Sequence, residues 1–187
     1  MTYDITTIIR DARIAQGLNP QAEQAWIPDA VCRQLTPDMA IERRIEQAAR
    51  AVCSEADDAL LAECVATIDA VPAFTDDHSG CIVLPADFMR LCVFWMNDWE
   101  RPVRKAIDIA DENYLMQRCR YPGLRGNPQR PVCAIVCAQG GLQLEFYGYK
   151  TRKANIKTAL YHPYPSIRDG QLINMPASLY PAMIDML

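Results

Sequence analysis

Residues 132–149 read VCAIVCAQGGLQLEFYGY, and this stretch decides the fold of the second half of the 187-residue chain. Two runs rich in β-branched, aromatic and other apolar side chains, 132–138 and 142–149, flank Gly140 and Gly141. A glycine pair between two such runs is typical of a β-hairpin, because glycine adopts the positive φ angles that tight hairpin turns require. The sequence therefore predicts a pair of antiparallel strands here.

Further strands are expected on both sides of this hairpin. Runs of high β-propensity bounded by turn residues occur at 80–84, 88–96, 103–109, 156–162 and 172–175. A brief helix is expected at 111–118, since Asp111 and Glu112 favour a helix N-terminus. The density of Pro and Gly in 121–131 predicts an irregular loop.

The first 70 residues have a helical period instead. Residues 5–16 place apolar side chains on one face, and 54–64 is a shorter helix candidate. The strongest signal combines Thr36 as N-cap with Pro37 at the first helical position. The buried stripe of that helix is expected to be Ile41, Ile45, Ala48 and Val52.

The last residues form an apolar helical face composed of Leu179, Met183, Ile184 and Leu187. This helix has no capping residue and no charged last turn, so either packing on another element completes it or the natural chain continues beyond Leu187. Helices followed by a mostly antiparallel sheet and a terminal helix indicate an α+β fold, with the N-terminal helices packed on the sheet. We expect one compact domain with a helical region 1–70, a β-rich region 71–176 and a C-terminal helix 177–187.

Composition excludes several classes of protein. Half of the residues are hydrophobic and 22% are charged, which suits a globular domain and not a disordered chain. No apolar run approaches the roughly 18 residues that a membrane span needs. The first residues lack the basic and apolar regions of a signal peptide. We therefore expect a soluble cytosolic protein with no membrane partner.

Charge is divided unevenly along the chain. Residues 1–100 have a net charge of −10, whereas residues 101–157 carry 11 Lys and Arg against 4 Asp and Glu, a net charge of +7. This split favours a polyanion partner, head-to-tail contact between copies of the chain, or neutralisation of one half by the other within a monomer. The candidate subunit or DNA contacts are Arg118, Arg120, Arg125, Arg130, Lys150, Arg152 and Lys153. A nonspecific nucleic-acid-binding domain that uses residues 101–157 is thus one alternative.

Catalytic and metal-binding patterns are not found in the sequence. It has no nucleophile elbow, Walker loop, HExxH motif or dinucleotide-binding fingerprint. Its eight cysteines have no CxxC spacing, so we expect small buried side chains in place of zinc ligands. Asp98 and Glu100 are interpreted as loop residues and His78 as a solvated turn residue. We expect no catalytic residue, metal or cofactor, with an enzyme of unknown type as a second alternative.

One stretch resembles a known class of virion proteins. Residues 82–91 read IVLPADFMRL, a strand followed by a Leu-Pro-x-Asp-Phe turn and an extended apolar run. Together with NDWERPV at 97–103, RGNPQRPV at 125–132 and LEFY at 144–147, this is similar to small proteins at the head–tail junction of tailed phages. The likeness is greatest to adaptor or head-completion proteins encoded by Bacteroides phages and prophages.

The resemblance implies a structural subunit without enzymatic activity, in a ring that joins the portal to the tail. Its partners would be other copies of itself, portal and tail proteins, and DNA through nonspecific contacts. Such subunits assemble into rings on a template, so a monomeric state of the isolated chain agrees with this role. The implied location is the virion, and the host bacterial cytoplasm during assembly. The apolar terminal helix with Leu179, Met183, Ile184 and Leu187 would face the portal.

Overall fold

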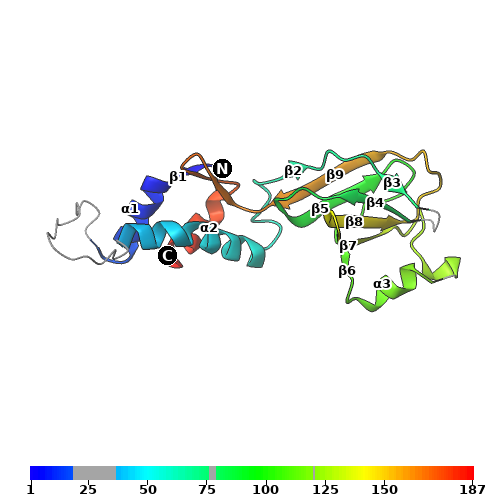
Figure 1. Ribbon diagram of the computed structural model, residues 1–187, viewed down its shortest axis with the longest axis horizontal. Coiled ribbons are helices and arrows are strands. Elements are labelled where there is room, and N and C mark those ends of the chain that lie inside the picture. Colours follow the sequence, from blue (N-terminus) through cyan, green and yellow to red (C-terminus); the bar gives the residue numbers. More distant parts are fainter. Residues whose placement is uncertain (19–36, 76–78, 120) are drawn as a thin grey trace. The chain divides into compact units, whose positions relative to one another are not determined.

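The computed structural model describes residues 1–18, 37–75, 79–119 and 121–187 (Figure 1). Within these residues, helices and strands in several sheets make an α+β fold, as predicted. The chain divides into two compact units. Unit 1 contains residues 1–64 and 164–187, and unit 2 contains residues 65–163. The expected single domain with boundaries at 70 and 176 differs from this division, because the chain leaves unit 1 once and returns to it.

The elements are as follows. The helices are α1 (Ile5–Ala15), α2 (Pro37–Glu55), α3 (Glu112–Gln117) and α4 (Tyr180–Asp185), with 3-10 turns η1 (Pro122–Leu124) and η2 (Ala177–Leu179). The strands of unit 1 are β1 (Tyr3–Asp4), β10 (Ser166–Arg168) and β11 (Gln171–Ile173). The strands of unit 2 are β2 (Ala66–Thr67), β3 (Ala73–Phe74), β4 (Ser79–Val83), β5 (Phe88–Met96), β6 (Ile107–Asp108), β7 (Val132–Ala138), β8 (Gly141–Tyr147) and β9 (Ile156–Pro163).

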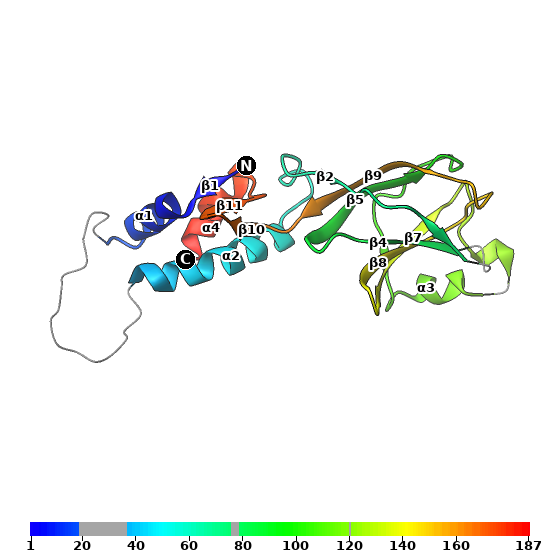
Figure 2. The same cartoon turned by 45° about the horizontal axis from the view of Figure 1, so that its top comes forward.

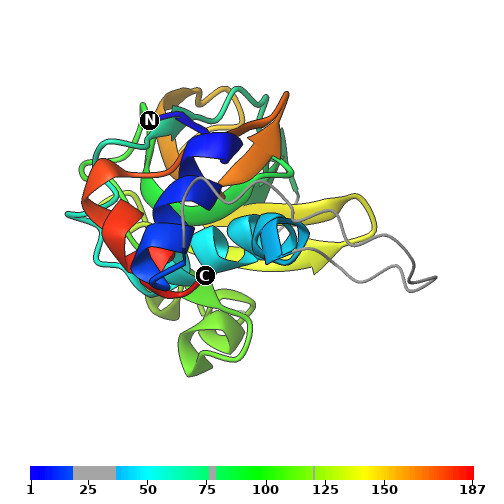
Figure 3. The same ribbon diagram turned by 90° about the vertical axis from the view of Figure 1, so that its left-hand side faces the viewer.

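Unit 1 combines three helices with a small sheet. Strand β11 pairs antiparallel with both β1 and β10, and Tyr3 lies opposite Leu172. This pairing joins the C-terminal segment to the N-terminal helices, which explains why residues 164–176 do not belong with the other strands. Helix α4 packs against α1 and α2 (Figures 2 and 3). Ile8, Ile45 and Met183, one from each helix, are fully buried, so the three helices share an apolar core.

The apolar face of the terminal helix is covered within unit 1. Leu179, Met183 and Leu187 are buried, and Ile184 is half-buried. Arg44 on α2 donates to the carbonyl oxygens of Met186 and Leu187, groups that would otherwise have no intrahelical donor. Packing on other elements therefore completes this helix. Most of the apolar area proposed to face a portal is used inside the unit.

The prediction of a separate helix at 54–64 is wrong. Helix α2 continues to Glu55, and consecutive turns follow it. The amides of Leu60 and Leu61 donate to the carbonyls of Asp57 and Asp58, three residues earlier. Aspartate favours such turns because its short polar side chain competes for backbone hydrogen bonds and lowers helix propensity.

The α2 helix itself is confirmed, with a small change in its buried stripe. Ile41, Ile45 and Ala48 are buried as predicted, whereas Val52 is only half-buried. Ala49 and Cys53 are buried instead. The stripe therefore moves by one position along the second half of the helix. The predicted N-cap, Thr36, lies outside the described residues.

Unit 2 consists of two sheets (Figures 1 and 2). One has the strand order β2-β9-β5, and the other has the order β3-β4-β8-β7-β6. The hairpin predicted at 132–149 is confirmed, with Val132 opposite Tyr147 and Ala138 opposite Gly141. The strand predicted at 103–109 is shorter than expected, since only β6 is formed. Val103 bridges to Phe94 and Ile107 pairs with Ala134, so this segment crosses from one sheet to the other.

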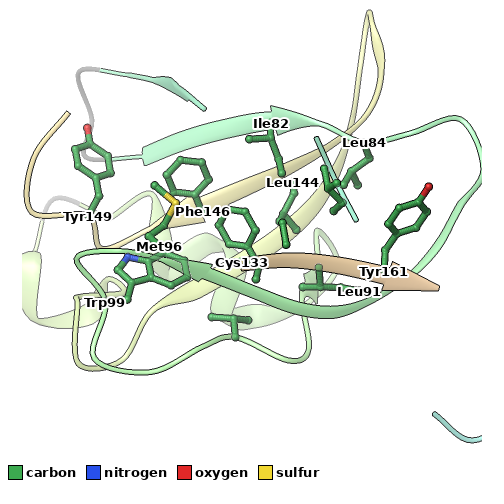
Figure 4. Close-up of a cluster of buried hydrophobic side chains, with 14 of the residues drawn as sticks. Ile82, Leu84, Leu91, Met96, Trp99, Cys133, Leu144, Phe146, Tyr149 and Tyr161 are labelled. Carbon is green, nitrogen blue, oxygen red and sulfur yellow. The ribbon is translucent and has the colours of Figure 1, made fainter. Parts of the chain in front are cut away.

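The two sheets enclose a shared aromatic core (Figure 4). Phe146 on β8 is fully buried, and its ring contacts Phe74, Phe94, Trp99 and Tyr149. The side chains of β7 alternate between this core and the opposite face of the sheet, as strand geometry requires. On that opposite face a smaller buried cluster consists of Tyr114, Ala134, Val136 and Tyr147. Tyr114 belongs to α3, so this cluster fastens α3 to the sheet.

Cysteine burial follows the prediction only in part. Cys53, Cys64 and Cys133 are buried, and Cys137 is exposed near the end of the β7–β8 hairpin. Burial raises the pKa of the Cys53 thiol to about 11 and raises the pKa of Cys133 as well. These buried thiols remain protonated at neutral pH and serve as small apolar side chains. Cys32 lies outside the described residues.

Candidate functional site

The described basic residues singled out in the sequence all belong to unit 2. Arg118 is the C-cap of α3, and Arg125 and Arg130 lie on the irregular segment after it. Lys150, Arg152 and Lys153 lie on the connection from β8 to β9, and all three are exposed. Arg120 lies outside the described residues.

Hydrogen bonds fasten these two basic segments to a common turn. The backbone amide of Lys150 donates to Oδ2 of Asp98 at 2.5 Å. The amide of Glu100 donates to the carbonyl of Pro128 at 2.9 Å. Gly148 has a φ of +99° and lies so close to Asn127 that a Cβ atom would come within 2.8 Å of its Cα. The residues around 98–100, 127–128 and 148–150 therefore form one junction at the base of both basic segments.

Two adjoining hollows bring the arginines together. One, of about 480 Å³, is lined by Thr75, Ser79, Gln117, Arg118, Arg125, Glu145 and Tyr147. The other, of about 560 Å³, shares Gln117 and Arg125 with the first and also contacts Arg130. Lys150, Arg152 and Lys153 line neither hollow. The sequence-predicted set is thus split into an arginine group and a separate group on the β8–β9 connection.

A carboxylate organises the first hollow. Glu145 on β8 accepts hydrogen bonds from the hydroxyls of Tyr114 at 3.1 Å and Tyr147 at 2.6 Å. Arg118 donates to the Tyr114 hydroxyl at 2.6 Å and to Glu145 at 3.3 Å, and its guanidinium lies over the Tyr114 ring. Burial, with the nearby Glu145 charge, raises the pKa of Tyr114 and Tyr147. Both tyrosines are therefore neutral hydrogen-bond donors at physiological pH.

A buried glutamine fixes the arginine segment in place. Gln117 donates to the carbonyl of Asn113 at 3.1 Å and accepts from the amide of Gly126 at 2.6 Å. Arg125 donates to the carbonyl of Cys119. These bonds join the end of α3 to the loop beyond η1. The segment is irregular, as predicted, but it is held by specific contacts.

Sequence reasoning did not single out the residues that build this site. Tyr114 and Gln117 were expected only as parts of a helix, and Glu145 and Tyr147 as parts of a strand that also contributes to the phage resemblance. One signal was available, because Glu145 is the only charged residue in the stretch 132–149. A lone carboxylate in an apolar strand needs partners when it is partly buried. The identity of those partners depends on the placement of α3 against β8.

Several large apolar side chains on this segment are exposed. Leu115 is 72% exposed, Met116 42%, Tyr121 71% and Leu124 53%. We name these four residues with Arg118 and Arg125 the α3–η1 surface. An exposed group of apolar side chains on a soluble domain is typical of a site of macromolecular contact. Met, Tyr and Arg are also enriched at the centre of protein–protein interfaces.

The other candidate residues from the sequence do not form a catalytic or metal-binding group among the described residues. Asp98 contacts the backbone of Lys150, and the adjoining Glu100 is exposed. No group of three or more His, Cys, Asp or Glu side chains gathers as metal ligands would in the described ranges. His78 lies outside them. Among the described helices, none has the length and apolar composition needed to cross a membrane.

Comparison with known proteins finds no matching family model and no matching curated protein. The α3–η1 surface combines exposed apolar groups with arginines on a firmly anchored segment. That arrangement suits binding of a macromolecule.

Proposed function

We propose that this chain is a structural subunit of a tailed-phage or prophage virion, with no enzymatic activity. In this role it is a head–tail adaptor or head-completion protein that assembles into a ring between portal and tail. The observation that carries the proposal is the α3–η1 surface, a single segment that exposes four large apolar side chains and also carries two arginines. A protein that works by contact with neighbouring subunits needs such a surface, because apolar burial drives most protein association.

The sequence resemblance gives this contact surface its particular assignment. The stretch 82–91 includes the end of β4, a turn and the start of β5. In the turn, the Phe88 amide donates to the carbonyl of Pro85 at 3.0 Å, and the Tyr161 hydroxyl donates to Asp87 at 2.9 Å. The resembling residues thus hold the β4–β5 connection in unit 2, which is the same unit that carries the contact surface.

Charge also supports assembly with other copies. From the sequence, unit 1 has a net charge of −6 and unit 2 has a net charge of +2. Opposite charges on different surfaces of one chain favour a contact between unlike faces of two copies. Such a heterologous contact closes into a ring when the rotation between copies permits.

The proposal is tested by binding to the portal. The chain is co-expressed with the portal protein encoded in the same phage or prophage genome, and the products are separated by size exclusion with light scattering. We expect the chain to elute with the portal at a mass that corresponds to several copies. A chain that always elutes apart from the portal, and that is missing from purified virions by mass spectrometry, contradicts the proposal.

A second candidate function is nonspecific DNA binding. Arg130, Lys150, Arg152 and Lys153 are exposed, and the segments that carry them meet at one junction. Lysine and arginine contacts to phosphates produce affinity that falls steeply as salt increases. Duplex DNA binding with that salt dependence would favour this function, and absence of binding at low salt would remove it.

A further inference from the structure

An acidic segment of unit 1 carries the opposite charge to the two arginines of the α3–η1 surface. Residues 55–63, which we name the acidic turn, begin at the last residue of α2 and contain Glu55, Asp57, Asp58 and Glu63, all exposed. The sequence has no Lys or Arg between residues 51 and 89. The acidic turn also exposes an apolar side chain at its middle, since Leu60 is 43% exposed.

The acidic turn is a fixed part of unit 1. Leu61 is buried beneath it. Ser178 donates through its hydroxyl to the carbonyl of Leu60 at 3.3 Å, and the amide of Ala177 donates to Glu63 at 3.1 Å. Because the turn is already ordered, little conformational entropy is lost when a partner binds it.

We propose that the α3–η1 surface of one copy binds the acidic turn of the next copy. This inference rests on the proposed ring function and names the two surfaces that join neighbouring subunits. The two surfaces come from different units, so the contact is heterologous and each copy has one of each. Repetition of one such contact builds a ring when the rotation between neighbouring copies closes.

The two surfaces match in chemistry. The α3–η1 surface would bring Arg118, whose side chain is 61% exposed, to the carboxylates of Glu55 and Asp57. Its exposed apolar side chains would cover Leu60. Opposite charges set the partner and the orientation, while apolar area supplies most of the free energy of association.

The composition of the α3–η1 surface favours a protein over DNA as its occupant. Glu145 lies 3.3 Å from Arg118 and offsets part of its positive charge. The charge of Arg118 therefore contributes little to the free energy of association. Most of that free energy must come from the apolar side chains of Leu115 and Leu124. The DNA backbone presents phosphates and sugars, which give such side chains little apolar surface to bury.

The test uses two double variants of the full chain. Glu55→Lys with Asp57→Lys makes the acidic turn less acidic, and Leu115→Glu with Leu124→Glu adds negative charge to the α3–η1 surface. Matched controls are Asp69→Lys and Val71→Glu, which change exposed residues outside both surfaces. Assembly is measured by sedimentation velocity over a concentration series, for the chain alone and with the portal. Circular dichroism melts verify that each variant is folded.

We expect each double variant to weaken assembly by about tenfold or more, and the controls to assemble like the unaltered chain. An equimolar mixture of the two double variants should recover part of the assembly, because the new lysines of one face the new glutamates of the other while the apolar area of Leu115 and Leu124 stays lost. Recovery in the mixture supports a direct contact between the two surfaces.

Several results would overturn the inference. If rings form on the portal and both double variants assemble normally, the surface assignment fails while the proposed function stands. If no assembly forms alone or with the portal, both fail. A third result, in which the Leu115→Glu and Leu124→Glu variant loses duplex DNA binding by fluorescence anisotropy yet assembles normally, would assign the surface to DNA.

Discussion

Arg44 on α2 donates to the carbonyl oxygen of Leu187 at 2.9 Å and so closes the end of the terminal helix from a distant part of the chain. A second bond from the same guanidinium reaches the carbonyl of Met186 at 2.8 Å. Met186 is the C-cap of α4, and α2 supplies side-chain donors to the carbonyls of Met186 and Leu187. Capping by a residue far away in sequence makes α4 dependent on the packing of unit 1.

Replacement of Arg44 by Met should destabilise unit 1. Two carbonyl groups would lose their charged donor, a loss of about 1–2 kcal/mol in the free energy of unfolding. Urea denaturation followed by far-UV circular dichroism measures this change. Arg43→Met is the matched control, because Arg43 is an exposed neighbour on the same helix. Equal stability of the two variants would show that the Arg44 bonds contribute nothing.

Gly148→Ala should strongly destabilise unit 2. Gly148 has a φ of +99°, and a Cβ atom there would come within 2.7 Å of the carbonyl carbon of Asn127. Backbone strain and the clash together should cost about 2–4 kcal/mol. Gly140→Ala is the control, since a Cβ atom at Gly140 meets nothing within 4 Å. Thermal melts of the two variants distinguish a strained junction from a general effect of glycine replacement.

Glu145→Gln should lower the pKa of Tyr114 and Tyr147. The substitution keeps a hydrogen-bond acceptor but removes the negative charge that disfavours tyrosinate. Ultraviolet absorbance of tyrosinate during an alkaline titration measures the shift. Glu112→Gln, a change at an exposed carboxylate on α3, serves as the control. An unchanged titration curve in Glu145→Gln would show that Glu145 does not act on these tyrosines.

Alkaline pH should destabilise unit 2 through Tyr161. Burial and the hydrogen bond to Asp87 raise the pKa of Tyr161 from 10.0 to about 12. Above pH 10 the unfolded chain loses this phenol proton while the folded chain retains it, so the free energy of unfolding falls between pH 10 and about 12. Below pH 10 the contribution is fully present.

Denaturation at a series of pH values checks this prediction. Tyr161→Phe should be less stable at neutral pH, because the hydrogen bond to Asp87 is lost, but should show a shallower decline above pH 10. Asp87→Asn keeps the phenol and should reduce the decline by lowering the pKa of Tyr161. Identical slopes in all three proteins would contradict the role of this pair.

Local patterns predicted the regular elements well. The hairpin at β7–β8 follows from a glycine pair between two apolar runs, and α2 from Pro37 and its apolar stripe. Both signals act over a few residues, so a single sequence contains them. The error at 54–64 has the same local scale, because Asp57 and Asp58 favour turns in a stretch whose apolar spacing suits a helix.

Local sequence patterns did not predict which distant segments pair with each other. The return of the chain to unit 1 depends on Tyr3 pairing with Leu172, and no local pattern links two such distant residues. The candidate site has the same character. Its arginines were found by counting charge, whereas the Tyr114 and Glu145 contact requires that α3 pack on the far face of the β7–β8 hairpin. Both the β1–β11 pairing and the Tyr114–Glu145 contact depend on how distant segments pack, which local sequence patterns do not specify.

The interrupted course of unit 1 sets the order in which the protein folds during synthesis. Domains usually fold in turn from the N-terminus as the chain leaves the ribosome. Here all of residues 65–163 are made before β11 and α4 exist. Helices α1 and α2 are therefore synthesised first. Their apolar residues Ile8 and Ile45 are not covered by α4 until residues 180–185 have been made. Unit 1 is therefore completed only after residues 164–187 have been synthesised.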